Sequence, residues 1–264
     1  MTARAYILGD SATMLRRNLR HMQRYRSMIL FIAGIPVVFL LLFVYVFGGT
    51  LGSGLGGVSG GREAYIAYVI PGILLMTVAG GATGTAIAVA MDMTEGIVAR
   101  FRTMDISSAS VLTGHVLGSM IQTGLAIGVV VGVALLIGFR PTTVPAEWLA
   151  AAGMVALTTL AVTWLSVALG LSTRSVETAS NLPMFLSLLP FLGSGFVPTR
   201  TMPDGLRWFA ENQPFTPIIE TLRGLLLGTP IGDSGAIAVA WCLAISLLGF
   251  LWARKLYERD PAPR

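Results

Sequence analysis

Long apolar stretches alternate with short polar ones along this chain, and the apolar stretches have the length of membrane spans. About 20 apolar residues are enough to cross the hydrocarbon core of a bilayer as a helix. The pattern predicts six spans, at residues 28–47, 65–90, 111–139, 148–171, 181–197 and 234–252. The predicted fold is therefore an all-α integral membrane protein, with residues 1–264 forming a single transmembrane domain.

The N-terminal stretch has a different pattern. Residues 1–27 carry six arginines, and apolar residues recur among them with helical spacing. This predicts an amphipathic helix in the cytoplasmic membrane interface. A cleavable signal peptide is the alternative, but the apolar run that follows, 28–47, is longer than the apolar region of a signal peptide. At the other end, residues 253–264 form a predicted cytoplasmic tail.

Two of the segments between the predicted spans have unusual compositions. Residues 48–61 read GGTLGSGLGGVSGG, and we expect a flexible loop. A phosphate-binding P-loop would need a lysine after its glycines, and the only lysine of the chain is Lys255. Residues 198–233 contain five prolines and two short amphipathic pieces, at 206–210 and 218–225. Neither piece is long enough to span, so we predict two short helices in the outer leaflet between spans five and six.

Small residues recur every four positions in the third predicted span. Gly124, Gly128 and Gly132 form such a row, and rows of this kind let helices approach closely in membranes. We interpret the row as packing within the chain, with a seam between two copies as the alternative.

Composition agrees with the membrane assignment. The chain is 54% hydrophobic and only 12% charged, whereas soluble domains are about 25% charged. Lys and Arg residues number thirteen on the side of the two predicted termini and five on the other side. The positive-inside rule therefore predicts cytoplasmic termini. The same rule explains the net charge of +5, so nucleic acid is not an expected partner.

The spans offer little chemistry of their own. Asp, Glu, Lys and Arg are absent from all six, although ion-coupled transporters place ionisable groups there. The single cysteine, Cys242, allows no intrachain disulfide, and His21 and His115 lack partners at metal-ligand spacing. We predict no catalytic site, no metal site and no cofactor in this chain. Energy for transport would have to come from a partner.

One polar stretch could receive that energy. It covers residues 91–114, between the second and third predicted spans. Asp92 and Glu95 have the spacing of an N-cap residue and the third helical residue, so we expect a helix to begin at Asp92.

The expected helix has an apolar stripe with basic flanks. Ile97, Phe101 and Met104 share one face, and Arg100 and Arg102 lie on either side of it. A short helix of this kind suits a groove in a partner protein or the membrane surface. An ordinary polar loop between two spans is the alternative.

Two segments of the chain resemble one family. Residues 92–114, DMTEGIVARFRTMDISSASVLTG, are similar to the coupling region of ABC-2 type permeases of the daunorubicin/doxorubicin-resistance group. Residues 196–228, FVPTRTMPDGLRWFAENQPFTPIIETLRGLLLG, are similar to the segment before the last span of that group. The order of spans and loops agrees over essentially the whole chain. One departure is Met104-Asp105, where the group often has Leu-Pro, and it could change how the coupling helix ends.

The resemblance implies an ATP-driven half-transporter. Two permease subunits would pair with two copies of a separate ABC ATPase, which would bind ATP and Mg. The second permease subunit is expected to be an identical copy, with a heterodimer left open. The complex would export hydrophobic or amphiphilic compounds, such as drugs or antibiotics, across a bacterial plasma membrane. Alternatives are the permease of a lipid or glycolipid exporter and, from another class, a non-transporting membrane scaffold.

The resemblance also implies two sets of site residues. The ATPase-coupling residues would be Glu95, Ile97, Arg100, Phe101, Arg102 and Met104. The substrate path would run between two permease subunits, walled by spans two and five, with Met76, Phe185, Leu189 and Phe191 as its candidate residues.

Overall fold

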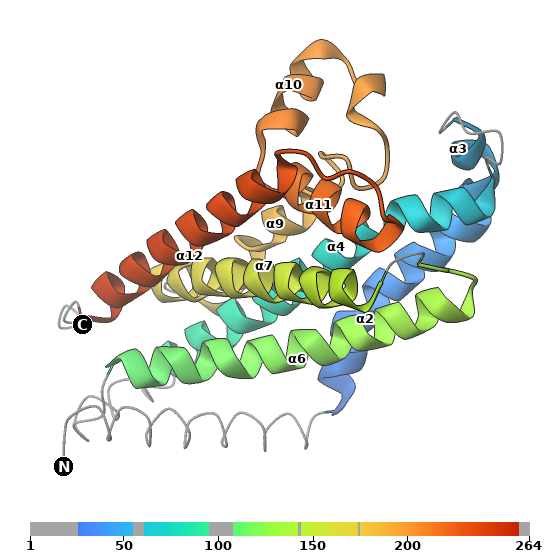
Figure 1. Cartoon of the computed structure of the whole chain (residues 1–264). Helices are drawn as coiled ribbons and strands as arrows, with labels where there is room; N and C mark the ends of the chain where they lie inside the picture. The colour runs from blue at the N-terminus through green and yellow to red at the C-terminus, as the bar shows by residue number, and fades with distance from the viewer. Residues whose placement is uncertain (1–25, 55–60, 95–107, 142–143, 174, 259–264) are drawn as a thin grey trace.

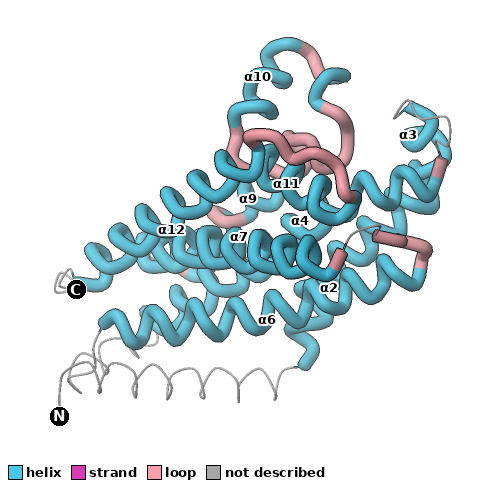
Figure 2. Tube along the Cα trace, viewed as in Figure 1, coloured by secondary structure: helices cyan, strands magenta, loops and turns pink. Residues whose placement is uncertain are grey.

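The computed structural model describes residues 26–54, 61–94, 108–141, 144–173 and 175–258. These ranges contain helices and the turns between them, and no strand (Figure 1, Figure 2). The predicted all-α class is therefore confirmed for the described part of the chain. The predicted amphipathic helix at 1–27 lies almost entirely outside it.

Five helical segments of the described chain are long and apolar enough to cross a membrane. The first runs through α2 (Arg26–Leu42), the π-helical turn η1 (Phe43–Phe47) and α3 (Gly48–Gly54). The other four are α4 (Arg62–Thr94), α6 (Ser108–Leu136), α7 (Pro145–Ser172) and α12 (Ser234–Glu258). Each overlaps one predicted span, so these five spans have a helical counterpart.

The prediction of a flexible loop at 48–61 is wrong for its first half, because α3 continues the first span to Gly54. Contacts with the start of α4 override the poor helix propensity of glycine. At Gly52 a β-carbon would lie 2.3 Å from the carbonyl oxygen of Gly61, so the contact needs glycine.

The predicted fifth span is not a single helix. It contains the end of α8 (Val176–Asn181), then α9 (Met184–Leu188), and continues as turns up to residue 196. Pro183 and Pro190 lack the backbone N–H that an uninterrupted helix needs. The structure thus leaves the sixth crossing untested.

The segment before the last span contains η2 (Thr199–Thr201), α10 (Asp204–Asn212) and α11 (Phe215–Leu227). Helix α11 ends at Gly228, whose φ of 66° provides the left-handed C-cap that favours glycine. Both predicted amphipathic pieces are therefore helical. Their depth in a bilayer stays a prediction.

Helix α4 lies at the centre of the molecule, in contact with α2, α6, α7, α8, α9 and α11 (Figure 1). In its most apolar stretch 72% of the residues are buried, against 22% in α12. Glycines permit two of its closest contacts. A β-carbon on Gly72 would lie 2.8 Å from the carbonyl oxygen of Gly195, and one on Gly170 of α7 would lie 2.6 Å from that of Ala86.

The glycine row of α6 does not pack within the chain, and that interpretation is wrong. Gly124 and Gly128 are exposed, and a β-carbon on either would meet no atom within 4 Å. The α4–α6 contact uses a different face, where Thr85 donates to Ser119 through their hydroxyl groups. The spacing identified a smooth helix face, but the protein turns that face outward.

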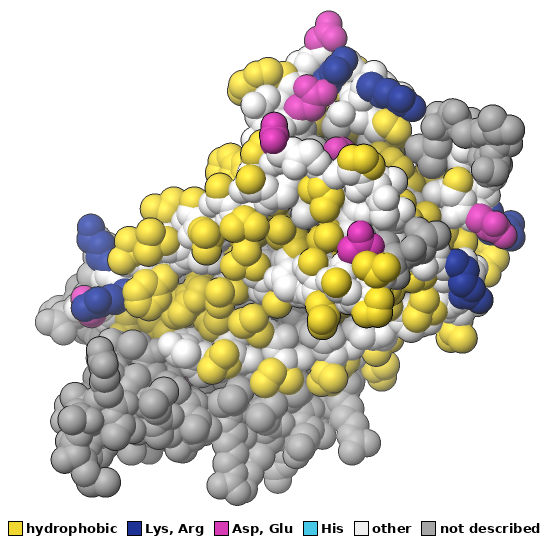
Figure 3. Space-filling model, viewed as in Figure 1, with side chains coloured by type: hydrophobic (Ala, Val, Ile, Leu, Met, Phe, Trp, Pro, Cys, Tyr) yellow, Lys and Arg dark blue, Asp and Glu magenta, His cyan; other side chains and the backbone are white. Residues whose placement is uncertain are grey.

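The long helices begin and end at two opposite ends of the molecule. At one end α4, α7 and α12 finish and α6 begins, and we call it the inner end after its predicted orientation (Figure 1). The outer end holds the starts of α4, α7 and α12 together with α10. On the face in Figure 3, Lys and Arg side chains gather at these two ends and over α10, with a mostly apolar or uncharged band between them.

Candidate functional site

The predicted coupling residues all belong to the segment 95–107, between the end of α4 and the start of α6 in the sequence. This segment is outside the described residues, so the predicted docking helix stays a prediction. It covers Glu95, Ile97, Arg100, Phe101, Arg102 and Met104. The structure does describe the two helices from which the segment leaves and to which it returns.

Those two helices are joined by a close contact between a histidine and a carboxylate. Nε2 of His115 in α6 lies 3.0 Å from Oδ2 of Asp92 in α4. The two side chains are only 11% and 15% exposed, respectively. Asp92 is in the last turn of α4, so the expectation of a helix that begins at Asp92 is wrong. A carboxylate is unfavourable at the C-terminal end of a helix dipole, and the contact with the His115 ring offsets part of this cost.

An apolar cluster beside this pair ties the inner ends of four helices together. We call it the inner cluster, and it contains Val89 of α4, Leu112 of α6, Trp164 of α7 and Tyr257 of α12, among others. The Trp164 ring meets the Phe250 ring edge-on, with centroids 5.0 Å apart. A displacement of the 95–107 segment would therefore act on a packed group of helices.

The short helix α8 begins at the same end. Ser175 caps it by accepting a hydrogen bond from the backbone N–H of Thr178, at 3.2 Å. The backbone N–H of Glu177 and the Ser175 side chain lower the pKa of the exposed Glu177 carboxyl group. This carboxylate therefore stays charged at the N-terminus of α8, where the helix dipole favours it.

The four predicted path residues lie in different environments. Met76 is buried within α4, whereas Phe185 of α9 is 68% exposed. Leu189 and Phe191 are partly buried in the turns after α9, packed against the core. Of the four residues, only Leu189 and Phe191 share one environment, the turns after α9.

Phe191 belongs to an aromatic cluster that joins the first span to these turns. Its ring stacks on Phe196 with centroids 4.3 Å apart, and Phe196 lies 4.7 Å from Phe43. Phe43 is the first residue of the π-helical turn η1, and such turns occur frequently at functional sites.

A mostly buried arginine at the outer end, Arg223, was missed by the sequence analysis, which counted it only among the charges on the outer side of the membrane. Nη2 of Arg223 donates to the carbonyl oxygens of Ser194, at 2.6 Å, and Tyr68, at 3.3 Å. Its guanidinium also lies 3.9 Å from the centroid of the Tyr68 ring. Arg223 therefore joins α11, α4 and the turns after α9. Its position among the leucines of α11 was the available signal.

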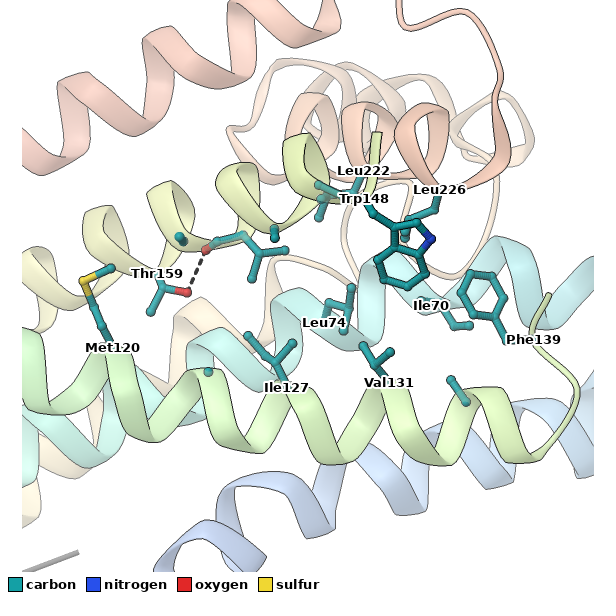
Figure 4. Close-up of a pocket in the computed structure, with 16 residues that line it drawn as sticks. Ile70, Leu74, Met120, Ile127, Val131, Phe139, Trp148, Thr159, Leu222 and Leu226 are labelled. Atoms are coloured by element: carbon teal, nitrogen blue, oxygen red, sulfur yellow. Dashed lines mark hydrogen bonds between the residues drawn. The ribbon is translucent and has the colours of Figure 1, made fainter. Parts of the chain in front are cut away.

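An apolar cavity of about 270 Å³ lies between α6 and α7, with α4 and α11 behind it (Figure 4). None of the predicted path residues lines it. Met120 and Thr159 lie at one end and Phe139 and Trp148 at the other. The lining residues are Ile70, Leu74, Met120, Gly124, Ile127, Val131, Ala134, Phe139, Trp148, Ala151, Ala152, Val155, Ala156, Thr159, Leu222 and Leu226.

Small residues frame the side of this cavity that reaches the protein surface. Gly124 of α6 and Ala152 and Ala156 of α7 line it and are exposed, while Ile70 and Leu74 of α4 form part of its buried wall. The gap between α6 and α7 exists because these three residues have little or no side chain. Sequence spacing revealed the small residues of α6 but not the helix across from them.

Comparison with known proteins gives one family. A family model described as ABC-2 type transporter matches residues 11–227. The chain is 27% identical over 228 residues to the daunorubicin resistance ABC transporter permease protein DrrB1 of Streptomyces coeruleorubidus, which covers 86% of this chain and 78% of the relative. It is 23% identical over 183 residues to the probable doxorubicin resistance ABC transporter permease protein DrrC of Mycobacterium tuberculosis, which covers 68% of this chain and 65% of that protein.

Proposed function

Because this chain belongs to the ABC-2 type transporter family, as a permease, we propose that it exports hydrophobic or amphiphilic compounds, such as drugs or antibiotics, from a bacterial cell. The observation that carries this proposal is the match over residues 11–227 in a chain with five apolar helices of spanning length. The substrate class is suggested by the drug-resistance names of the two relatives.

We further propose that the chain crosses the plasma membrane six times with both termini in the cytoplasm. The broken segment 181–197 would be the additional crossing. It starts just after the inner end of α7, and Tyr65, near the outer end of α4, donates a hydrogen bond to the carbonyl oxygen of Phe196 at 3.3 Å. This course supports a return to the outer end before α12.

The energy would come from two copies of a separate ABC ATPase, which would bind ATP and Mg. Its docking site would be the 95–107 segment, with Ile97, Phe101 and Met104 in a groove of the ATPase and the charged residues at the rim. The contact between Asp92 and His115 joins the two helices on either side of this segment, and the inner cluster lies beside it. ATP-driven motion would thereby reach α4 and α6.

The substrate path would lie between this permease and a second copy. Phe185 supports this assignment best, because it is the one exposed side chain among the four candidate path residues. Met76 is buried and would reach a path only after α4 moves. Leu189 and Phe191 would act as the wall behind Phe185.

Two alternatives remain distinct in experiment. A lipid or glycolipid exporter would show ATP hydrolysis that such lipids stimulate and drugs do not. A membrane scaffold would purify without an ATPase.

The decisive test is the variant Phe101→Ala. Loss of a buried aromatic anchor should weaken ATPase binding by roughly 2 kcal/mol or more. The measurement is the amount of ATPase recovered with tagged permease, beside drug efflux from cells. Arg102→Glu is the control at the rim, and it should weaken binding less and in a salt-dependent way. Full ATPase recovery and full efflux with Phe101→Ala would refute the docking site.

A further inference from the structure

We propose that the apolar cavity between α6 and α7 holds one acyl chain of an outer-leaflet phospholipid. Only two of its sixteen lining side chains carry a polar atom, Thr159 and Trp148. The Thr159 hydroxyl group donates to the carbonyl oxygen of Val155 at 2.7 Å, so its donor is already used. The ligand part inside must therefore be hydrocarbon, since a polar group would lose its hydrogen bonds with water and gain none.

The opening of the cavity lies on the surface that we expect to face the acyl chains of the bilayer. Its exposed frame, Gly124, Ala152 and Ala156, belongs to two spanning helices. Around those helices the neighbouring medium is the acyl chains of the bilayer. Apolar cavities of about 150 Å³ in proteins already take up benzene, and this one is larger, at about 270 Å³.

The length of the cavity corresponds to one leaflet. It follows α7 from Trp148 to Thr159, which at a rise of about 1.5 Å per residue is about 16 Å. One leaflet contributes about half of the ~30 Å hydrocarbon core. Trp148 lies in the first turn of α7, so the cavity occupies the half of the membrane at the outer end. The name of the leaflet rests on the proposed orientation, but occupancy by a lipid chain does not.

Polar groups at the outer end fit the headgroup of the same lipid. The indole nitrogen of Trp148 faces away from Thr159, towards that end (Figure 4). Arg140 follows the lining residue Phe139 and is exposed, with Nη1 donating to the carbonyl oxygens of Leu135 and Phe139. The nearby carboxylate of Glu147 accepts from the backbone N–H of Val144 at 3.2 Å. A lipid phosphate could therefore pair with the Arg140 guanidinium, while the Glu147 carboxylate is already hydrogen-bonded to the backbone.

The test uses the full chain reconstituted in vesicles of phosphatidylethanolamine and phosphatidylglycerol. A fraction of the phosphatidylglycerol carries a photoreactive diazirine on its acyl chain, and mass spectrometry locates the adducts after illumination. We expect adducts on Leu74 and Ala151, which line the cavity and are each only 4% exposed. If these two residues carry no adducts while exposed residues do, the proposal is wrong.

A matched pair of variants separates the cavity from general lipid contact. Gly124→Leu places a side chain at the opening, and Gly128→Leu adds the same side chain one turn further on, where it does not line the cavity. A β-carbon at either position meets no atom within 4 Å, so both variants should fold. We expect Gly124→Leu to lose the adducts on Leu74 and Ala151 and Gly128→Leu to keep them. Equal adduct yields in the two variants would overturn the proposal.

A second pair covers the case in which Gly124→Leu does not fold. Ala156→Leu fills the cavity from α7, and Ala150→Leu is its control on the exposed surface of the same helix. The expected results are the same loss and the same retention. A photoreactive side chain at Ala152 tests whether protein covers the opening instead of lipid. Cross-linking from this position to another copy of the permease would overturn the proposal.

Discussion

At the scale of single residues, the pair formed by Asp92 and His115 is the best-defined feature next to the proposed coupling segment. The two side chains are mostly buried and 3.0 Å apart. Removing one partner from such a pair leaves the other polar group desolvated, which costs more than the net contribution of the bond itself.

We expect His115→Leu to lower the free energy of unfolding by about 2 kcal/mol, the usual range for bonds to a charged group. Thermal unfolding in detergent measures the effect, and a double-mutant cycle with Asp92→Leu isolates the pair. Gln122→Leu is the control in the same helix, because the Nε2 atom of Gln122 is buried without a hydrogen-bond partner. If His115→Leu and Gln122→Leu lower the free energy of unfolding equally, and the double-mutant cycle shows no coupling, the contact between Asp92 and His115 does not stabilise the protein.

Sequence patterns reached these residues only in part. His115 was recognised as a polar residue in an apolar span, but its partner is 23 positions earlier and had the spacing of a helix cap. Arg223 was counted as an outer charge, although its contacts with Tyr68 and Ser194 bury it. Contacts between distant positions leave no trace in a single sequence, so polar residues can be identified from it but not paired.

At the scale of elements, glycine acts differently on α4 and on α6. On α4 it permits contact, because Gly72 touches Gly195 and Gly81 faces the side chain of Thr123. On α6 the row around Gly128 is exposed. Helical spacing predicts which glycines share a face, but the neighbour of that face depends on how all the helices assemble.

We expect Gly72→Ala to destabilise the protein by about 1–3 kcal/mol, because the new methyl group would overlap the backbone of Gly195. Gly80→Ala is the matched control in α4. Its β-carbon would meet no atom within 4 Å, and alanine is the better helix former, so stability should be unchanged or higher. The measurement is thermal unfolding of both variants in the same detergent. Equal stability of the two variants would contradict the packing of 195 against α4.

At the scale of the whole molecule, the spans with long apolar sequences were predictable and the broken one was not. Twenty apolar residues without charge leave a membrane helix as almost the only solution, since backbone groups in lipid must be satisfied internally. The stretch 181–197 is also apolar and uncharged, but its prolines interrupt the helix and contacts with α4 stabilise the turns. Hydrophobicity predicts where the chain is buried, not whether it is a single helix there.

The proposed six crossings make a direct prediction about labelling. In a Cys242→Ala background, Glu177→Cys should resist an impermeant thiol reagent added outside intact cells, and Glu211→Cys should react. Both side chains are exposed, so burial does not explain a difference. Reaction after permeabilisation is the positive control for Glu177→Cys. If both cysteines react from the same side, the segment 181–197 does not cross the membrane.

The central position of α4 has a consequence for biosynthesis. Tyr65 and Tyr68 belong to the second span to be made, yet their partners Phe196 and Arg223 follow 131 and 155 residues later. At a synthesis rate of about 5–20 residues per second, that separation corresponds to a delay of roughly 7–30 s. During this interval the outer half of α4 lacks its native contacts with Phe196 and Arg223. Lipid or the insertion machinery would have to cover that surface until α11 is synthesised. A chain truncated before Arg223 would therefore lack the contact between α11 and the central helix α4.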